Sequence, residues 1–264
     1  DDLKRRDLTI NAIAQTKSGK IIDLHGGCKD LKKRIFRHIS PAFAEDPVRI
    51  LRLARFAARF SDFKIHQATN KLMRDMLAKG EVDALVPERV WQELEKALNE
   101  QSPERFFETL KKCLVLRKLF PKISSNFTAI KKALIRVVKL SSDPIVRFAA
   151  ITFNLDGDEI KLLCKRYRIP KAYKDLSLLA SKFKNKLGEL SKDTEGTVTL
   201  LEQMDVYRRP QRLQQFLYAC EANGGCSTKI ANKLYEAYQL TKKVRLPPKI
   251  IEQSDKNDLR KILH

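Results

Sequence analysis

Residues 45–60 read EDPVRILRLARFAARF, and this stretch decides the fold because it repeats arginine at helical spacing. At about 100° per residue, one helix face carries all of its arginines: Arg49, Arg52, Arg55 and Arg59. The opposite face is apolar, with Ile50, Leu51, Leu53, Ala54, Ala57, Ala58 and Phe60, while Val48 and Phe56 fall on the arginine side. Asp46-Pro47 supplies an N-cap and a proline at the first helical position. The stretch therefore predicts an amphipathic helix to about Phe60, with one buried face and one face lined by guanidinium groups.

Strand-forming sequence lies before this helix. Ile10–Ala14 and Lys20–Leu24 flank the turn-like Lys17-Ser18-Gly19, a pattern that predicts a hairpin. His25-Gly26-Gly27 follows as a turn, and the next residues predict a short helix at Lys29–Arg34 and a short strand at Ile35–Ile39. We expect these elements to form a small α/β unit.

After residue 60 the pattern is helical to the end of the chain. Periodicity and proline punctuation predict helices at Gln67–Lys79, Pro87–Asn99, Pro103–Cys113, Phe127–Leu140, Pro144–Phe153, Asp158–Tyr167, Lys171–Leu187, Thr197–Val206, Pro210–Ala222, Ser227–Thr241 and Lys249–Leu263. Glycine is scarce and no repeat period is evident. The predicted fold is mainly α, with a small α/β remnant at its N-terminus.

The composition points to a polyanionic partner. The chain of 264 residues has 53 Lys+Arg against 32 Asp+Glu, a net charge of +21, which repels itself in a compact fold. No stretch approaches the roughly 20 apolar residues needed to cross a bilayer. The five cysteines form no CxxC pair and the histidines number four, so we expect reduced thiols in a cytoplasmic protein and no structural zinc site.

Asp46 and Arg49 are the candidate reading pair of the arginine helix. They lie three positions apart and so on one turn, where a carboxylate and a guanidinium fork offer an acceptor and donors to a nucleobase edge. The other arginines of the face suit phosphates. The alternative is a solvated arginine face beside a capping aspartate, which is the commoner case for an arbitrary helix of this composition.

The order of three motifs decides between these alternatives. DDLKRRDLTINAIA at 1–14 precedes IIDLHGGCKD at 21–30 and SPAFAEDPVRILRLARFAARF at 40–60. This order resembles the class II tRNA nucleotidyltransferases, of the CCA-adding gammaproteobacterial type, and the related bacterial poly(A) polymerases. RRDLTINA resembles the ribose-recognition motif of the family and EDPVR its amino-acid template, EDxxR. The resemblance continues to VPERVWQELEKAL at 86–98 and, more weakly, to YRRPQRLQQF at 207–216; SPAFAEDP favours the CCA-adding branch.

The resemblance implies a role for each matched residue. It assigns nucleotide binding to Arg6, Asp7, Asn11, Asp46, Arg49, Arg52 and Arg55. Arg6 and Asp7 would contact the ribose and phosphates, and Asn11 would hold the local backbone or approach the sugar. Asp46 and Arg49 would hydrogen-bond the base of CTP or ATP in place of a template. Arg52 and Arg55 would help to hold the nucleotide, and Glu45 would position Arg49 or its loop.

The family's metal-binding motifs are not found in this sequence. The resemblance implies two Mg²⁺ ions held by a DxD that follows a glycine-rich GGxVRD loop, and both belong upstream of residue 1. We therefore expect an incomplete head, no catalytic or metal-binding residues in this chain, and no activity from the chain alone. Asp156-Gly157-Asp158 has DxD spacing, but its polar context within the helical body is typical of a loop.

The body departs from its relatives in a second way. Related enzymes often carry a His-Asp phosphohydrolase site there, whereas Phe153-Asn154 stands here where His-Asp would fall. The histidines, His25, His38, His66 and His264, lie elsewhere. Without clustered imidazoles and carboxylates that metal site is not formed, so we expect no phosphohydrolase activity and a core position for Phe153.

Basic residues are dense in the second half and predict a surface that follows an RNA backbone. They are Lys131, Lys132, Arg136, Lys139, Lys165, Arg166, Arg168, Lys182, Lys184, Lys186, Arg208, Arg209, Arg212, Lys242, Lys243 and Arg245. A tRNA acceptor arm, recognised by shape and backbone, fits such a surface. We expect Tyr167, Tyr207 and Phe216 to pack in the core more readily than to stack on bases, and Trp91 to be core.

These observations predict three parts: residues 1–42 as the remainder of a nucleotidyltransferase head, 43–120 as a helical neck with the nucleotide-recognition helix, and 121–264 as an RNA-binding body and tail with a degenerate HD-like region. The expected function is addition of CMP and AMP, from CTP and ATP, to tRNA 3′ ends. The alternatives are a poly(A) polymerase of the same family and a non-catalytic RNA-binding module.

Overall fold

In the residues that the computed structural model describes, 3–190 and 193–243, all strands lie within the first 65 residues. Strands β1 (Ile13–Gln15) and β2 (Ile21–Asp23) form the predicted antiparallel hairpin. The first strand begins later than predicted because η2 (Thr9–Asn11) is a 3₁₀ turn. Helix α1 (Gly27–Lys33) follows, and β3 (Ile35–Phe36) pairs in parallel with β4 (Lys64–Ile65), which lies beyond the next helix.

The His25-Gly26-Gly27 turn brings α1 against η2. Gly26 has φ +72°, a left-handed conformation that favours glycine. A Cβ on Gly27 would lie 2.2 Å from the carbonyl oxygen of Thr9, so only glycine permits this approach. The turn thus fixes the segment that contains Asp7 and Asn11.

Helix α2 (Val48–Arg59) is the predicted arginine helix. Its buried residues are Val48, Ile50, Leu51, Leu53, Ala54, Ala57 and Ala58, and the helix packs against α4 (Pro87–Asn99) and α5 (Glu104–Lys112). The prediction was wrong at two positions: Val48 is buried, and Phe60 is exposed. Phe60 follows the helix with non-helical dihedral angles, so the helical periodicity does not apply to it.

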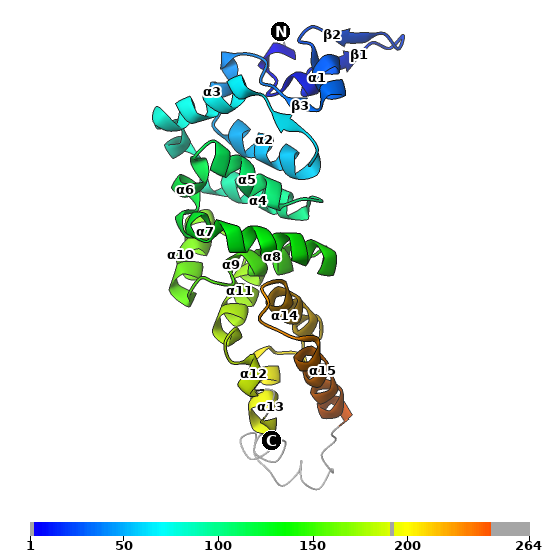
Figure 1. The fold of residues 1–264 in the computed structure, drawn as a ribbon, viewed down its shortest axis with the longest axis vertical. Helices are drawn as coiled ribbons and strands as arrows, with labels where there is room; N and C mark the ends of the chain where they lie inside the picture. Colours follow the sequence, from blue (N-terminus) through cyan, green and yellow to red (C-terminus); the bar gives the residue numbers. More distant parts are fainter. Residues whose placement is uncertain (1–2, 191–192, 244–264) are drawn as a thin grey trace.

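Helices stack in succession from the head to the far end of the elongated molecule (Figure 1). Between and after those named, the chain forms η1 (Leu3–Arg5), η3 (Pro41–Glu45), α3 (Gln67–Ala78), η4 (Glu81–Ala84), α6 (Val115–Leu119), α7 (Pro121–Ser125), α8 (Phe127–Leu140), α9 (Pro144–Thr152), α10 (Gly157–Tyr167), α11 (Lys171–Phe183), α12 (Leu187–Leu190), α13 (Thr194–Gln203), α14 (Gln211–Ala222) and α15 (Thr228–Lys243). The mainly α fold with a small α/β piece at its N-terminus is confirmed.

The helical prediction differs from the structure between α5 and α8 and after α11. Helices α6 and α7 were not predicted; α5 ends near Leu114, whose φ of +67° breaks the helix, and Pro121 begins α7. The span Lys171–Leu187 is divided between α11 and α12. The helix predicted at Lys249–Leu263 lies outside the described residues.

A single apolar cluster runs from the head into the last helices. Trp91, Tyr167 and Phe216 are buried as predicted, whereas Tyr207 is exposed and so corrects the prediction of a core position. Tyr207 instead lies beside Tyr238, with ring centroids 6.2 Å apart. In the part of the chain that the structure describes, we find no helix of the length and apolarity that crossing a membrane demands.

Candidate nucleotide-binding site

Asp46 and Arg49 lie where η3 meets α2, and each is held by another part of the chain. Asp46 caps α2: its Oδ1 accepts from Val48 N at 3.0 Å. Arg49 donates to two backbone carbonyl oxygens, of Ala42 at 2.6 Å and of Arg5 at 2.9 Å. The guanidinium therefore joins the head segment to the start of the arginine helix and keeps N–H groups for another acceptor.

Arg89, near the start of α4, is the second partner of Asp46. Its guanidinium meets the carboxylate with both terminal nitrogens, Nη1 to Oδ1 at 3.2 Å and Nη2 to Oδ2 at 2.8 Å. Burial by itself would raise the pKa of Asp46. The hydrogen bonds from Arg89 and Val48, together with the charges of Arg89 and Arg49, outweigh burial, so the pKa is lowered. Asp46 is thus an ionised acceptor at neutral pH.

Asp7 is buried beneath the arginine face. Its Oδ1 accepts from Asn11 Nδ2 at 2.8 Å and from Leu8 N at 3.0 Å, and its Oδ2 accepts from Arg52 Nε at 2.9 Å. Burial acts to raise the pKa of this carboxyl, but Asn11, Arg52 and the Leu8 amide together lower it. Asp7 is 5% exposed, and through the hydrogen bond at Oδ2 it holds Arg52, whose side chain is 40% exposed.

Arg55 is more enclosed than Arg52, with a side chain that is 13% exposed against 40%. Its Nε donates to the buried Glu93 at 2.7 Å, and its Nη1 lies 3.8 Å from Glu100. The guanidinium also lies over the ring of Phe56, with its carbon 4.6 Å from the centroid. These contacts tie α2 to α4, because Glu93 is one helical turn beyond Arg89.

The structure brings most of the predicted site residues to the region where the head, α2 and α4 meet. Arg6 is exposed next to the buried Asp7, and Arg52 and Arg49 follow on α2. The sequence analysis missed Arg89, although it quoted the VPERV motif that contains this residue. It also missed the carbonyl oxygens of Arg5 and Ala42, for which side-chain types give no signal.

The described residues do not supply a metal site. Among residues 3–190 and 193–243, no group of three or more His, Cys, Asp or Glu side chains could hold an ion. Asp156, the first residue of the DxD-like spacing, instead caps α10: it accepts from Asp158 N at 2.9 Å and Glu159 N at 2.8 Å, and Glu159 accepts in return from Asp156 N. The residues present therefore do not fit the pair of metal ions that the resemblance implies.

In the body, Phe153 is buried as predicted, where a His-Asp site would need a histidine. His38 and His66 belong to the head–neck junction: His66 faces Arg37 Nη1 at 2.8 Å, and His38 Nδ1 lies 2.9 Å from Thr69 Oγ1. His264 lies outside the described residues.

The basic residues of the body divide into two groups. Some are neutralised by neighbours, as in the pairs Arg209–Asp205, Arg212–Asp175, Arg168–Glu88 and Lys131–Glu108. Others are exposed, either on helices, as are Lys132, Lys139, Lys165 and Lys242, or in the turns between helices, as are Lys186 and Arg208. Arg245 lies outside the described residues.

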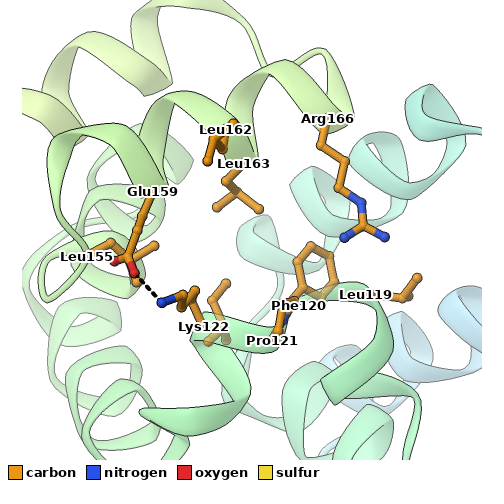
Figure 2. A pocket seen from close by; sticks show the side chains of 10 residues that line it. Leu119, Phe120, Pro121, Lys122, Leu155, Glu159, Leu162, Leu163 and Arg166 are labelled. Carbon is orange, nitrogen blue, oxygen red and sulfur yellow. Dashed lines mark ion pairs between the residues drawn. The ribbon is translucent and has the colours of Figure 1, made fainter.

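An apolar cavity of about 230 Å³ lies between α7 and α10. Figure 2 shows Phe120 and Leu163 facing its interior, Arg166 at one side, and the ion pair of Lys122 with Glu159 at the other. The Lys122 nitrogen lies 2.6 Å from the Glu159 carboxylate. None of the predicted nucleotide-binding residues lines this cavity.

Two family profiles match the chain. A profile described as the poly A polymerase head domain covers residues 1–37, and one described as a probable RNA- and SrmB-binding site of polymerase A covers residues 62–127. The first contains Arg6, Asp7 and Asn11; the second contains Arg89.

Curated relatives match over almost the whole chain. A CCA-adding enzyme of Coxiella burnetii is 43% identical over 94% of this chain and 66% of its own length. A multifunctional CCA protein of Nitrosococcus oceani is 44% identical over 91% of this chain and 68% of its own length. The chain therefore spans about two thirds of the length of these relatives.

A solved structure shares the fold. The Thermotoga maritima CCA-adding enzyme, complexed with tRNA, superposes with a TM-score of 0.71 over 99% of this chain and 67% of its own, at 23% sequence identity. At that identity the match establishes the arrangement of the helices and no more.

Proposed function

This chain belongs to the family of CCA-adding enzymes, and on that premise we propose that it is the nucleotide-selecting and tRNA-binding part of an enzyme that adds CMP and AMP to tRNA 3′ ends. The substrates would be CTP, ATP and tRNA, and the protein would work in the cytoplasm. The observation that carries the proposal is the fixed pair of Asp46 and Arg49 at one edge of the arginine helix.

The pair has the chemistry to select two bases of four. Cytosine and adenine carry an exocyclic amino donor where uracil and guanine carry a carbonyl oxygen. Asp46, held ionised, accepts from such a donor and repels a carbonyl oxygen. Arg49 has N–H groups left for the ring nitrogen beside the amino group, so one acceptor and one donor suffice to admit CTP and ATP.

The remaining predicted residues divide by exposure. We assign Arg6 and Arg52 to the ribose and phosphate side of the nucleotide, because both side chains reach solvent beside the reading pair. Asn11 donates to Asp7, which in turn holds Arg52, and Arg55 holds α2 against α4 through Glu93. Arg55 would therefore support the site by keeping the helix that carries Arg52 in place.

The acceptor RNA would lie on the body. Its exposed cations are distributed over several helices and would follow a phosphate backbone with little base readout. The tRNA in the Thermotoga complex suits this assignment, since that enzyme has the same succession of helices.

Nucleotidyl transfer of this kind uses two divalent metal ions. Since the described residues do not fit such a site, we assign no step of the reaction to them. The part proposed here is selection and orientation: Asp46 and Arg49 place the base, and Arg6 and Arg52 hold the triphosphate side.

The proposal is tested on the complete gene product with radiolabelled CTP, ATP and UTP and two acceptors, tRNA that lacks its CCA end and an oligo(A) primer. We expect CMP and then AMP on the tRNA, and little extension of the primer. Asp46→Asn, which replaces one acceptor oxygen by an amide donor, should raise UMP incorporation relative to CMP. Extension of the primer with AMP alone would instead identify a poly(A) polymerase, and nucleotide-independent tRNA binding without incorporation would identify an RNA-binding module.

A further inference from the structure

Arg89 is outside the motif that the family resemblance assigns to base reading, yet it touches Asp46 more extensively than any residue of that motif. It donates to both carboxylate oxygens, from Nη1 to Oδ1 at 3.2 Å and from Nη2 to Oδ2 at 2.8 Å. The two residues are separated by 43 positions and come from different helices. A guanidinium that donates to both oxygens of a carboxylate fixes the orientation of the carboxylate plane and stabilises its charged form.

We infer that Arg89 is a positioning residue for base selection: by holding Asp46 as an oriented, proton-free acceptor, it excludes uracil and guanine from the nucleotide site. This inference rests on the proposed role of Asp46 and adds a residue and a mechanism of fidelity to it.

The argument follows from the protonation states of Asp46. As a carboxylate it accepts from the amino group of cytosine or adenine. Once protonated, it is itself a donor and can pair with the carbonyl oxygen of uracil or guanine, so the discrimination at this position is lost and only that of Arg49 at the ring nitrogen remains. Fidelity therefore depends on keeping this carboxyl ionised although it is partly buried.

The charged groups that act on Asp46 are Arg89 from α4 and Arg49 from α2. Burial works in the opposite direction and raises the pKa of Asp46. Removal of Arg89 leaves burial opposed by Arg49 and the Val48 amide alone, so the pKa of Asp46 rises. The carboxylate also loses the fork that sets its plane.

The test measures dissociation constants of CTP and UTP for the chain at pH 7.5 and pH 5.5, with wild type, Arg89→Ala and Arg89→Lys. We expect Arg89→Ala to lower the preference for CTP over UTP by about tenfold at the higher pH, and further at the lower pH. Arg89→Lys restores a positive charge without the two-pronged geometry of a guanidinium. It should therefore return the pH dependence to that of wild type, while part of the lost preference for CTP over UTP remains at neutral pH.

Arg117→Ala, which removes an exposed arginine on α6, is the matched control for the loss of one positive charge and should behave as wild type. Far-UV circular dichroism of each variant checks that it is folded. If wild type prefers CTP and Arg89→Ala keeps the same preference at both pH values, the inference is overturned and the proposed function stands. If wild type shows no preference for CTP, the reading role of Asp46 fails and the role of Arg89 fails with it.

Discussion

Asp7 shows how one buried carboxylate organises the residues around it. It accepts hydrogen bonds from Asn11, Arg52 and the amide of Leu8 while it is almost wholly removed from water. A buried charge is stable only while its partners remain. We therefore propose that Asp7 contributes to ribose binding indirectly, by orienting Arg52.

The lowered pKa of Asp7 predicts a pH dependence of stability. A carboxyl whose folded pKa lies below its ordinary value of 3.8 stabilises the fold above that pH, and the contribution is lost as the pH falls through the folded value. Asp7→Asn should therefore be less stable than wild type at pH 7, with the difference shrinking below about pH 4. Urea unfolding from pH 3 to pH 7 measures this; a difference that does not depend on pH would contradict it.

Arg52→Ala leaves Asp7 buried without its charged partner. Because the Arg52 side chain is 40% exposed and the other two donors remain, we expect a loss of about 1–2 kcal/mol in the free energy of unfolding. Arg59→Ala, on the same helix and exposed, is the control and should change stability by less than about 0.5 kcal/mol. Equal effects of the two substitutions would show that Asp7 does not depend on Arg52.

Sequence reasoning found the arginines of α2 because their spacing is a local property. It did not find Arg89, since a partner 43 positions away on another helix leaves no periodic signal. It also did not identify the carbonyl oxygens of Arg5 and Ala42, which hold the guanidinium of Arg49. Backbone acceptors exist at nearly every residue, so only the fold shows which of them is used.

At the level of elements, α1 depends on a glycine for its approach to η2. Gly27→Ala would place a Cβ 2.2 Å from a backbone oxygen, and one of the two elements must shift. We expect a loss of about 1–3 kcal/mol in unfolding free energy and weaker CTP binding, because η2 adjoins Asp7 and contains Asn11.

Gly157→Ala is the control for this substitution. Gly157 is likewise the first residue of its helix, α10, but a Cβ there would meet only Leu178 at an ordinary 3.7 Å. The unfolding free energy of the Gly157→Ala variant should stay within about 0.5 kcal/mol of wild type. Helix propensity favours alanine at both positions, so a loss at Gly157 as large as that at Gly27 would contradict the close approach as the cause.

Arg147 joins α9 to the end of α4. Its buried guanidinium donates to the carbonyl oxygens of Leu98 at 2.6 Å, Glu100 at 2.9 Å and Ser141 at 3.0 Å. Methionine in Arg147→Met fills similar space but leaves these acceptors unpaired. We therefore expect the free energy of unfolding to fall by about 3 kcal/mol. Arg136→Met removes one long hydrogen bond at the surface and should cost less than about 0.5 kcal/mol. Thermal and urea unfolding of both variants compares them directly, and equal losses would contradict the account.

The boundaries of the long helices were predictable because proline and capping residues mark them. Asp143 caps α9 through Ile145 N, and α4 and α8 span the predicted residues. The short helices α6 and α7 were not predicted: few residues give little periodicity, and the left-handed Leu114 between α5 and α6 is not a residue type that signals a break.

At the scale of the whole molecule, the net charge of +21 predicts a strong dependence of tRNA affinity on salt. Release of counterions from several phosphates lowers the association constant about a thousandfold or more between 50 and 200 mM salt. Lys165→Gln on α10 should reduce the slope of log K against log salt by about one, whereas Lys17→Gln in the head hairpin should leave it unchanged. Filter binding across a salt series measures both, and an affinity independent of salt would contradict an RNA surface on the body.

The order of the layers predicts that the proposed nucleotide and RNA functions are separable. The head, α2 and α4 form one end, and the later helices extend away from it (Figure 1). Charge changes far along the body should alter tRNA affinity without changing which nucleotide is bound.

Base selection by Asp46 and Arg49 is the central claim, and the dissociation constants of CTP, ATP, UTP and GTP for wild type and Arg49→Ala test it most directly. The account predicts that wild type binds CTP and ATP at least about tenfold more tightly than UTP and GTP, and that Arg49→Ala loses this preference. Equal affinity of wild type for all four nucleotides, or an unchanged preference in Arg49→Ala, would contradict it.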